Sequence, residues 1–111
     1  MQLPTIKEAI QRISELAEAE ELDVSRRVRK HMDNLGYLDP DVCDMLYELA
    51  ESDCEKIEWS YREPYVPVAT FCAIFTPRDR DIERTDKLFV EVAIHQSSLY
   101  LLACKLYGSP E

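Results

Sequence analysis

The chain has 111 residues, a formal net charge of −9, 46% hydrophobic residues and 32% charged residues. This composition predicts one globular domain, residues 1–111, and excludes a disordered chain. The acidic balance argues against non-specific binding to nucleic acid, which depends on cations that neutralise phosphates. No apolar run approaches the ~20 residues that span a membrane, and the first residues, MQLPTIKEAI, lack the apolar core of an export signal. We therefore expect a cytoplasmic protein with no membrane association.

Residues 1–53 have the pattern of a helical part with three helices. The first helix begins at Thr5, because Thr5 and Glu8 have the spacing of a capping box. A helical period of apolar residues follows, and it includes Ile6, Ile10, Ile13, Leu16 and Ala17. The second helix is predicted to begin near Asp23 or Ser25 and to end at Gly36, since glycine adopts the left-handed conformation that ends many helices.

The third helix is predicted to begin with Asp39 as its cap and Pro40 at its first position, where a missing N–H costs nothing. From position 39 to 58 the chain has eight carboxylates and one basic residue, Lys56. We interpret the carboxylates of this helix and its end as a solvated face that could bind a partner, made by Asp41, Asp44, Glu48 and Glu51.

Residues 54–107 have the pattern of strands. Apolar residues alternate in KIEWSY, whereas VPVATFCAIFT is apolar on both faces and is typical of a central strand. KLFVEVAI and SLYLLACKLY follow, joined by the short turn HQSS, which favours an antiparallel hairpin. The predicted fold class is α+β, with three N-terminal helices followed by a four-stranded, mainly antiparallel sheet.

No motif indicates a metal or a cofactor. With two glycines, the chain has no glycine-rich phosphate loop. The four cysteines form no C-x-x-C pair, and neither histidine lies near a cysteine in sequence. We expect the cysteines to be buried thiols in a reducing compartment.

Basic residues concentrate in two places on this acidic chain. Arg26, Arg29 and Lys30 share one helical face, and the charged connection TPRDRDIERTD contains Arg78, Arg80 and Arg84. Two interpretations stay open. The residues form a solvated face that balances neighbouring carboxylates, or they contact the phosphates of RNA or the surface of a protein partner.

The segment DNLGYLDPDVCDMLYELAESDCEKIEWSY, residues 33–61, resembles the core of the motility quorum-sensing regulator (MqsR) family of toxins. The matching features are Leu35-Gly36 at a helix end, the aspartate-rich start of a helix, and Glu51-Ser52-Asp53 followed by Lys56. Weaker matches follow in FCAIFTP, LFVEV and LLACK, where the last strand ends in Lys105.

This resemblance implies a RelE-like ribonuclease fold that cleaves messenger RNA without a metal and is neutralised by an antitoxin. In that family, catalysis is attributed to two lysines, a glutamine and a tyrosine. The lysines correspond to Lys56 and Lys105, whereas Cys72 stands at the glutamine position and Phe89 at the tyrosine position. Phenylalanine can neither donate nor accept a proton.

Three functions therefore remain open. The first is a toxin-family endoribonuclease with an altered active site, whose partners are RNA and an antitoxin or other protein. The second is a non-catalytic interaction protein whose acidic face mimics nucleic acid and binds a basic, nucleic-acid-handling protein complex. The third and plainest is a helper or antitoxin-like subunit that packs on another small protein through the apolar helix from Thr5 to Leu22.

Overall fold

The computed structural model describes residues 2–77 and 84–108. The helices in this part of the chain are Ile6–Glu18 (α1), Arg26–Leu35 (α2) and Asp39–Tyr47 (α3), with a 3-10 turn at Glu51–Asp53 (η1). The strands are Leu22–Val24 (β1), Cys54–Trp59 (β2), Pro67–Phe75 (β3), Asp86–Ile94 (β4) and Leu99–Leu106 (β5). None of the helices in the described residues is long and apolar enough to cross a membrane.

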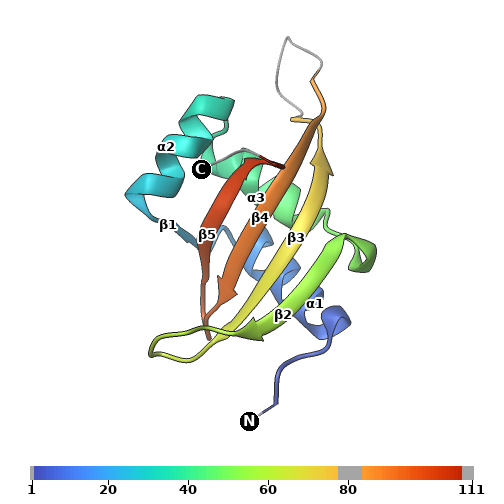
Figure 1. The fold of residues 1–111 in the computed structure, drawn as a ribbon, viewed down its shortest axis with the longest axis vertical. Coiled ribbons are helices and arrows are strands. Elements are labelled where there is room, and N and C mark those ends of the chain that lie inside the picture. Colours follow the sequence, from blue (N-terminus) through green and yellow to red (C-terminus); the bar gives the residue numbers. More distant parts are fainter. Residues whose placement is uncertain (1, 78–83, 109–111) are drawn as a thin grey trace.

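The strands form one mixed sheet in the order β1-β5-β4-β3-β2 (Figure 1). The pairs β2–β3, β3–β4 and β4–β5 are antiparallel, whereas β1 runs parallel to β5. The α+β class is confirmed. The prediction of four strands is wrong, because the described residues contain a fifth, β1.

β1 has three residues and pairs only with a strand more than seventy positions away in sequence, from Leu22↔Leu99 to Val24↔Leu101. Periodicity assigned these residues to the ends of two helices. Helix α1 instead stops before Glu20, whose φ of 57° lies in the left-handed region. The chain then pairs with β5, and the amide of Leu99 donates to the carbonyl of Glu21 at 2.8 Å.

The caps of the first two helices follow the sequence prediction. The Thr5 side chain accepts from the amide of Glu8, and the Glu8 carboxylate accepts from the amide of Thr5. Ser25 caps α2, and Gly36 ends it with a φ of 78°. These devices are local, so the sequence alone predicts them.

The predicted cap of α3 is wrong by one residue. Leu38 occupies the cap position and Asp39 is already helical. The carboxylate of Asp41 accepts from the amide of Leu38 at 2.7 Å, which satisfies the helix end without a capping side chain at position 38.

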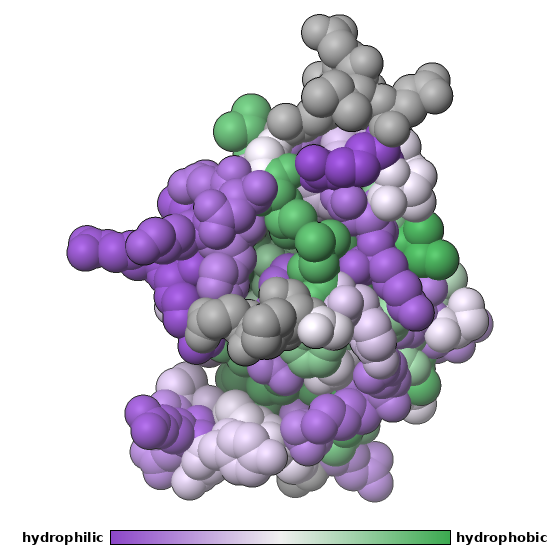
Figure 2. Space-filling view, turned by 45° about the horizontal axis from the view of Figure 1, so that its top comes forward, coloured by the Kyte–Doolittle hydropathy of each residue, from purple (hydrophilic) through white to green (hydrophobic). Residues whose placement is uncertain are grey.

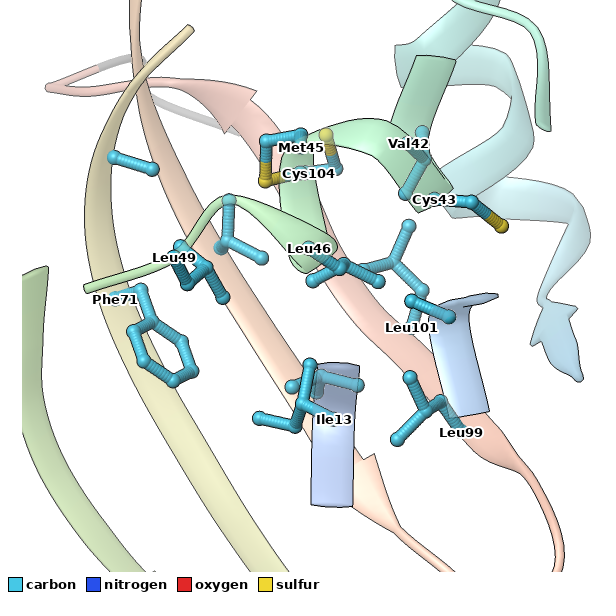
Figure 3. Packing of buried hydrophobic residues seen from close by; sticks show 14 of the residues in the cluster. Ile13, Val42, Cys43, Met45, Leu46, Leu49, Phe71, Leu99, Leu101 and Cys104 are labelled. Carbon is cyan, nitrogen blue, oxygen red and sulfur yellow. The ribbon is translucent and has the colours of Figure 1, made fainter. Parts of the chain in front are cut away.

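Helices α1 and α3 cover one face of the sheet, here called the inner face, and the main core lies between them and the strands (Figures 1 and 3). Ile13 and Leu46 approach the sheet from the helices, and Phe71 and Leu101 meet them from the strands. Each is fully buried, and burying such a side chain contributes roughly 1.5–3 kcal/mol.

Helix α2 lies beside β5, where Val28 and Met32 join the same core (Figure 1). The opposite, outer face of the sheet is the one turned toward the viewer in Figure 1, and none of the described helices lies across its β2–β3 side. One side of α2 therefore contributes to the core while another side borders the outer face.

Candidate functional site

Strand register determines which residues share the outer face. Lys56 of β2 lies opposite Thr70, Thr70 lies opposite Glu91, and Glu91 lies opposite Ala103 of β5. Two residues further along, Cys72, Phe89 and Lys105 form the next row across β3, β4 and β5. All four positions that the family resemblance singled out thus lie on one face of the sheet.

A hollow of about 130 Å³ opens between α2 and this face. Arg27 and His31 line it from α2, and Phe89, Glu91 and Lys105 line it from the strands. Because Arg27 and His31 are four residues apart on a helix, they lie on the same side of α2. We call this site the α2–sheet hollow.

The molecular surface is concave on this side. Figure 2 shows a hydrophilic mass over α2 and a second mass over the connection between β2 and β3, with apolar surface recessed between them. The outer face is therefore recessed beside α2 rather than flat.

Glu91 lies in the centre of the site. It is the carboxylate in the middle of the apolar strand β4, and the hydroxyl of the buried Thr70 donates to it at 3.5 Å. Its diagonal neighbour on β5 is Lys105, and such positions are ~7–8 Å apart at the backbone, within reach of long side chains. The hollow therefore contains a carboxylate, an imidazole and two cations.

The Lys105 ammonium lies 5.7 Å from the centre of the Phe89 ring, within cation–π range. Phe89 thus positions the cation rather than exchanging a proton. Cys72 is half-buried beside it in the same row. The predicted catalytic position Lys105 and its two neighbours are brought together.

Lys56 lies apart from this group. β2 is the edge strand, and three inter-strand spacings separate it from β5, about 14 Å at the backbone. The Lys56 ammonium pairs with Glu58 at 3.2 Å, and this hydrogen bond raises the pKa of Lys56 above its ordinary value. A raised pKa favours a permanent cation over a proton-accepting base.

The basic residues that the sequence predicted to contact RNA or a partner have different surroundings in the structure. Arg26 and Lys30 are exposed on α2. Arg29 instead pairs with Asp39, with its two guanidinium nitrogens 2.7 and 3.3 Å from the two carboxylate oxygens. Arg78 and Arg80 lie outside the described residues.

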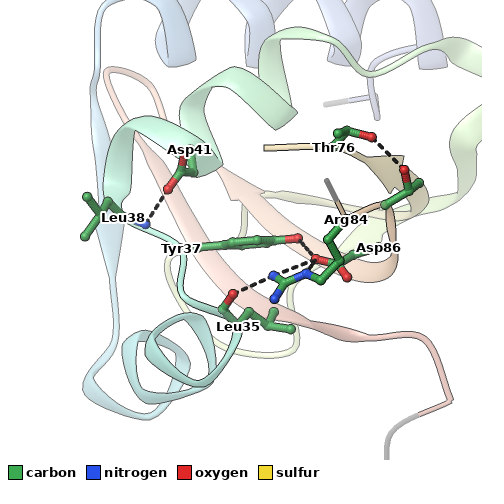
Figure 4. A network of polar contacts seen from close by, with 8 residues as sticks. Leu35, Tyr37, Leu38, Asp41, Thr76, Arg84 and Asp86 are labelled. Carbon is green, nitrogen blue, oxygen red and sulfur yellow. Dashed lines mark hydrogen bonds and ion pairs between the residues drawn. The ribbon is translucent and has the colours of Figure 1, made fainter. Parts of the chain in front are cut away.

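Arg84 belongs to a network that joins the end of α2 to the start of β4 (Figure 4). Its Nε and Nη2 lie 3.0 and 2.9 Å from Oδ2 of Asp86, and Nη2 also donates to the carbonyl of Leu35 at 2.6 Å. The hydroxyl of the buried Tyr37 donates to the same carboxylate oxygen at 2.5 Å. These contacts give Arg84 a structural role.

The predicted acidic face lies on the far side of the molecule from the outer face. Asp41 and Asp44 are half-buried, and Glu48 and Glu51 are exposed. Asp44 lines a second hollow of about 340 Å³ between α1 and α3, together with Glu18, Glu20 and Tyr47. The acidic residues are thus spread over α3, its end and a groove beside it.

Within residues 2–77 and 84–108, no three histidine, cysteine, aspartate or glutamate side chains gather as a metal-binding group. The four cysteines are free thiols. Burial raises the pKa of Cys104 to about 12 and that of Cys43 to about 11, so both are poor nucleophiles near neutral pH.

Sequence reasoning missed Arg27, His31 and Glu91. Glu91 had a signal, because a lone carboxylate inside LFVEVAI stands out in an otherwise apolar strand. Arg27 and His31 have the i, i+4 spacing of a shared helix side. The spacing does not show that this side of α2 faces the sheet, which only the packing of α2 beside β5 reveals.

A comparison of the chain with protein-family models, curated proteins and solved structures finds no match. The resemblance to the MqsR family therefore stays a prediction. Any function proposed for the chain therefore depends on the side chains that line the α2–sheet hollow.

Proposed function

We propose that this chain is a metal-independent endoribonuclease of the toxin type that cleaves RNA in the α2–sheet hollow. One observation carries the proposal: His31, Glu91, Arg27 and Lys105 line the same small hollow on an accessible face. Metal-free RNA cleavage needs a base, an acid and cations. In this proposal Glu91 is the base, His31 is the acid, and Arg27 and Lys105 are the cations.

In the proposed reaction, the Glu91 carboxylate accepts the proton of a ribose 2′-hydroxyl. The 2′-oxygen attacks the adjacent phosphorus, and the bond from phosphorus to the 5′-oxygen breaks. His31, as imidazolium, donates a proton to the leaving oxygen, since histidine can exchange protons near neutral pH. The products are a 2′,3′-cyclic phosphate and a 5′-hydroxyl. Atoms and protons balance without water or a metal.

Arg27 and Lys105 hold the scissile phosphate in this proposal. Charge on the phosphate oxygens grows toward the pentacoordinate transition state, and fixed cations stabilise that charge more than the ground state. The arginine presents several N–H donors in a fork, and the lysine acts as a point charge. Phe89 limits where the Lys105 ammonium can lie.

The overall charge of −9 does not exclude RNA at this site. Electrostatic attraction decreases over a Debye length of about 8 Å at physiological salt, so the charges nearest the hollow dominate. The charged side chains that line the hollow are Arg27 and Lys105, with Glu91 as the carboxylate among them, whereas α3 and its carboxylates lie behind the sheet (Figure 1).

A matched pair of lysine variants tests the site. Purified protein with EDTA is mixed with a short RNA, and the cyclic phosphate product is measured. Lys105→Gln should lower the cleavage rate roughly 10²-fold or more, the effect of losing one transition-state donor. Lys56→Gln should leave the rate largely unchanged. Equal losses in both variants would contradict the assignment to the hollow, and intact RNA with wild-type protein would reject the ribonuclease.

The second candidate is a non-catalytic interaction protein that binds a basic partner through its acidic side. The observation that favours it is the hollow between α1 and α3, which Glu18, Glu20 and Asp44 line together with the exposed Tyr47. Such a groove suits an arginine side chain. Binding of an arginine-rich peptide at low salt, weakened by Asp44→Asn but not by Asp23→Asn, would support it. No binding by the wild type would reject it.

A further inference from the structure

Aromatic and cationic side chains lie along the outer face of β4 and β5, on both sides of the α2–sheet hollow. On β4 the outward residues are Lys87, Phe89, Glu91 and Ala93, and His95 directly follows the end of the strand. Glu91 lies four residues from Lys87 and four from His95, about 13 Å in each direction along the strand. The hollow is therefore central on this face rather than at its end.

Beyond one side of the hollow lies Tyr107. Its amide donates to the carbonyl of Lys87 at 2.8 Å, which fixes the backbone beside β4 after β5 ends. The Lys87 ammonium lies 4.7 Å from the centre of the Tyr107 ring, on one face of it. Since Tyr107 is 48% exposed, a flat group from solvent can reach the ring.

Beyond the other side of the hollow lies Tyr100, opposite Ala93. Its ring centre is 6.5 Å from that of His95, and the two rings are inclined by 59°. Both residues are half-buried. Tyr100 lies opposite Ala93 and Tyr107 lies beside Lys87, and these two β4 residues are six positions apart, about 20 Å along the strand.

We propose that a single-stranded RNA lies along the outer face of β4 and β5, with one base stacked on Tyr107 and another, several nucleotides away, on Tyr100, so that one of the phosphates between them enters the α2–sheet hollow. This inference rests on the proposed function and deepens it, because it names the form of the substrate. The contact is to the face of a base, so it depends little on sequence.

The geometry suits one strand better than a duplex. Proteins that bind single strands combine aromatic side chains, on which unpaired bases stack, with cations that follow the backbone. Here Tyr107 lies with Lys87, Phe89 with Lys105, and Tyr100 with His95. Bases in a duplex are already stacked and paired, so the tyrosine rings would have no base to receive.

A non-cleavable probe separates binding from chemistry. Fluorescence anisotropy is measured with a short, labelled 2′-O-methyl oligoadenylate, which lacks the attacking 2′-hydroxyl. Tyr107→Ala should weaken binding by roughly 5- to 140-fold, the range that corresponds to losing one stacked base. Tyr107→Trp should retain binding, since it keeps an aromatic face. Tyr61→Ala is the control, because Tyr61 is 89% exposed on the connection between β2 and β3.

The outcomes distinguish this inference from the proposed function. If the probe binds in a Tyr107-dependent way but unmodified RNA stays intact, the RNA path is correct and the ribonuclease is wrong. If RNA is cleaved while Tyr107→Ala changes neither probe binding nor the KM for RNA, the ribonuclease stands and the RNA path is wrong. Equal binding of the corresponding duplex, or equal weakening by Tyr61→Ala, would also overturn the inference.

Discussion

Replacing Tyr37 with phenylalanine removes one hydroxyl from the network that holds α2 against β4. Tyr37 is 1% exposed and its hydroxyl donates to the buried carboxylate of Asp86 at 2.5 Å. The bond joins the segment directly after α2 to the start of β4, and both α2 and β4 contribute side chains to the α2–sheet hollow. Tyr37→Phe should therefore destabilise the fold and loosen the placement of α2.

The magnitude follows from what the substitution changes. The ring stays, including its edge-on contact with Phe75 at 5.8 Å and 89°, so packing is retained. A hydrogen bond to a charged acceptor is lost, and such bonds contribute roughly 1.5–3 kcal/mol. Asp86 keeps Arg84 as a partner, which limits the loss. We expect a decrease of about 2 kcal/mol in the free energy of unfolding, or about 1 M in the urea midpoint.

The assay is urea unfolding of the wild type, Tyr37→Phe and Tyr61→Phe, followed by circular dichroism. Tyr61→Phe controls for removing a tyrosine hydroxyl at an exposed position, and its midpoint should match the wild type. A decrease for Tyr37→Phe smaller than about 0.5 kcal/mol, the usual effect of a surface substitution, would show that the bond from Tyr37 to Asp86 does not stabilise the fold.

The same network gives a pH dependence with a defined sign. Burial, and then the hydrogen bond to Asp86, raise the pKa of Tyr37 above its ordinary value of 10.0. The folded state binds this proton more tightly than the unfolded state does. The resulting stability is fully present below about pH 10 and is lost as the pH rises above it. The Tyr37→Phe variant should lack this alkaline decrease.

Two further predictions concern the backbone and the thiols. Gly36→Ala should destabilise the protein by roughly 1–2 kcal/mol in urea unfolding, because the φ of 78° at this position is unfavourable for a residue with a Cβ; an unchanged midpoint would contradict the left-handed cap. Cys104, fully buried with a pKa raised to about 12, should react with a thiol reagent at about pH 8 only after unfolding, whereas the half-buried Cys54 should react in the native protein. Mass spectrometry of the labelled peptides identifies which cysteine has reacted. Rapid labelling of Cys104 in the native protein would contradict its burial in the core.

The sequence predicted the start of α1 and the end of α2 correctly, because a helix end depends on residues close to it in sequence. Thr5 with Glu8, and Gly36 after Leu35, correctly mark helix ends because each satisfies backbone groups within one turn. β1 could not be found in this way, since its pairing with β5 is parallel and distant in sequence. Three residues are too few for a period to be recognised.

The candidate site divides in the same way. Lys105 was singled out by the family resemblance, and the strand register places it on the outer face. Its neighbours in the hollow, Arg27 and His31, come from a helix whose basic residues had been grouped as Arg26, Arg29 and Lys30. Periodicity indicates which residues share a helix side, but tertiary packing decides which side meets the sheet.

In the proposed ribonuclease, Glu91 accepts the proton of the 2′-hydroxyl in the α2–sheet hollow. The most direct measurement is the single-turnover rate of RNA cleavage by Glu91→Gln, compared with Glu58→Gln, another carboxylate on the outer face. The glutamine at position 91 can still accept a hydrogen bond from Thr70 but cannot act as a base. We predict a rate roughly 10²- to 10⁴-fold lower for Glu91→Gln and near wild type for Glu58→Gln. Cleavage by Glu91→Gln at the wild-type rate would contradict the account.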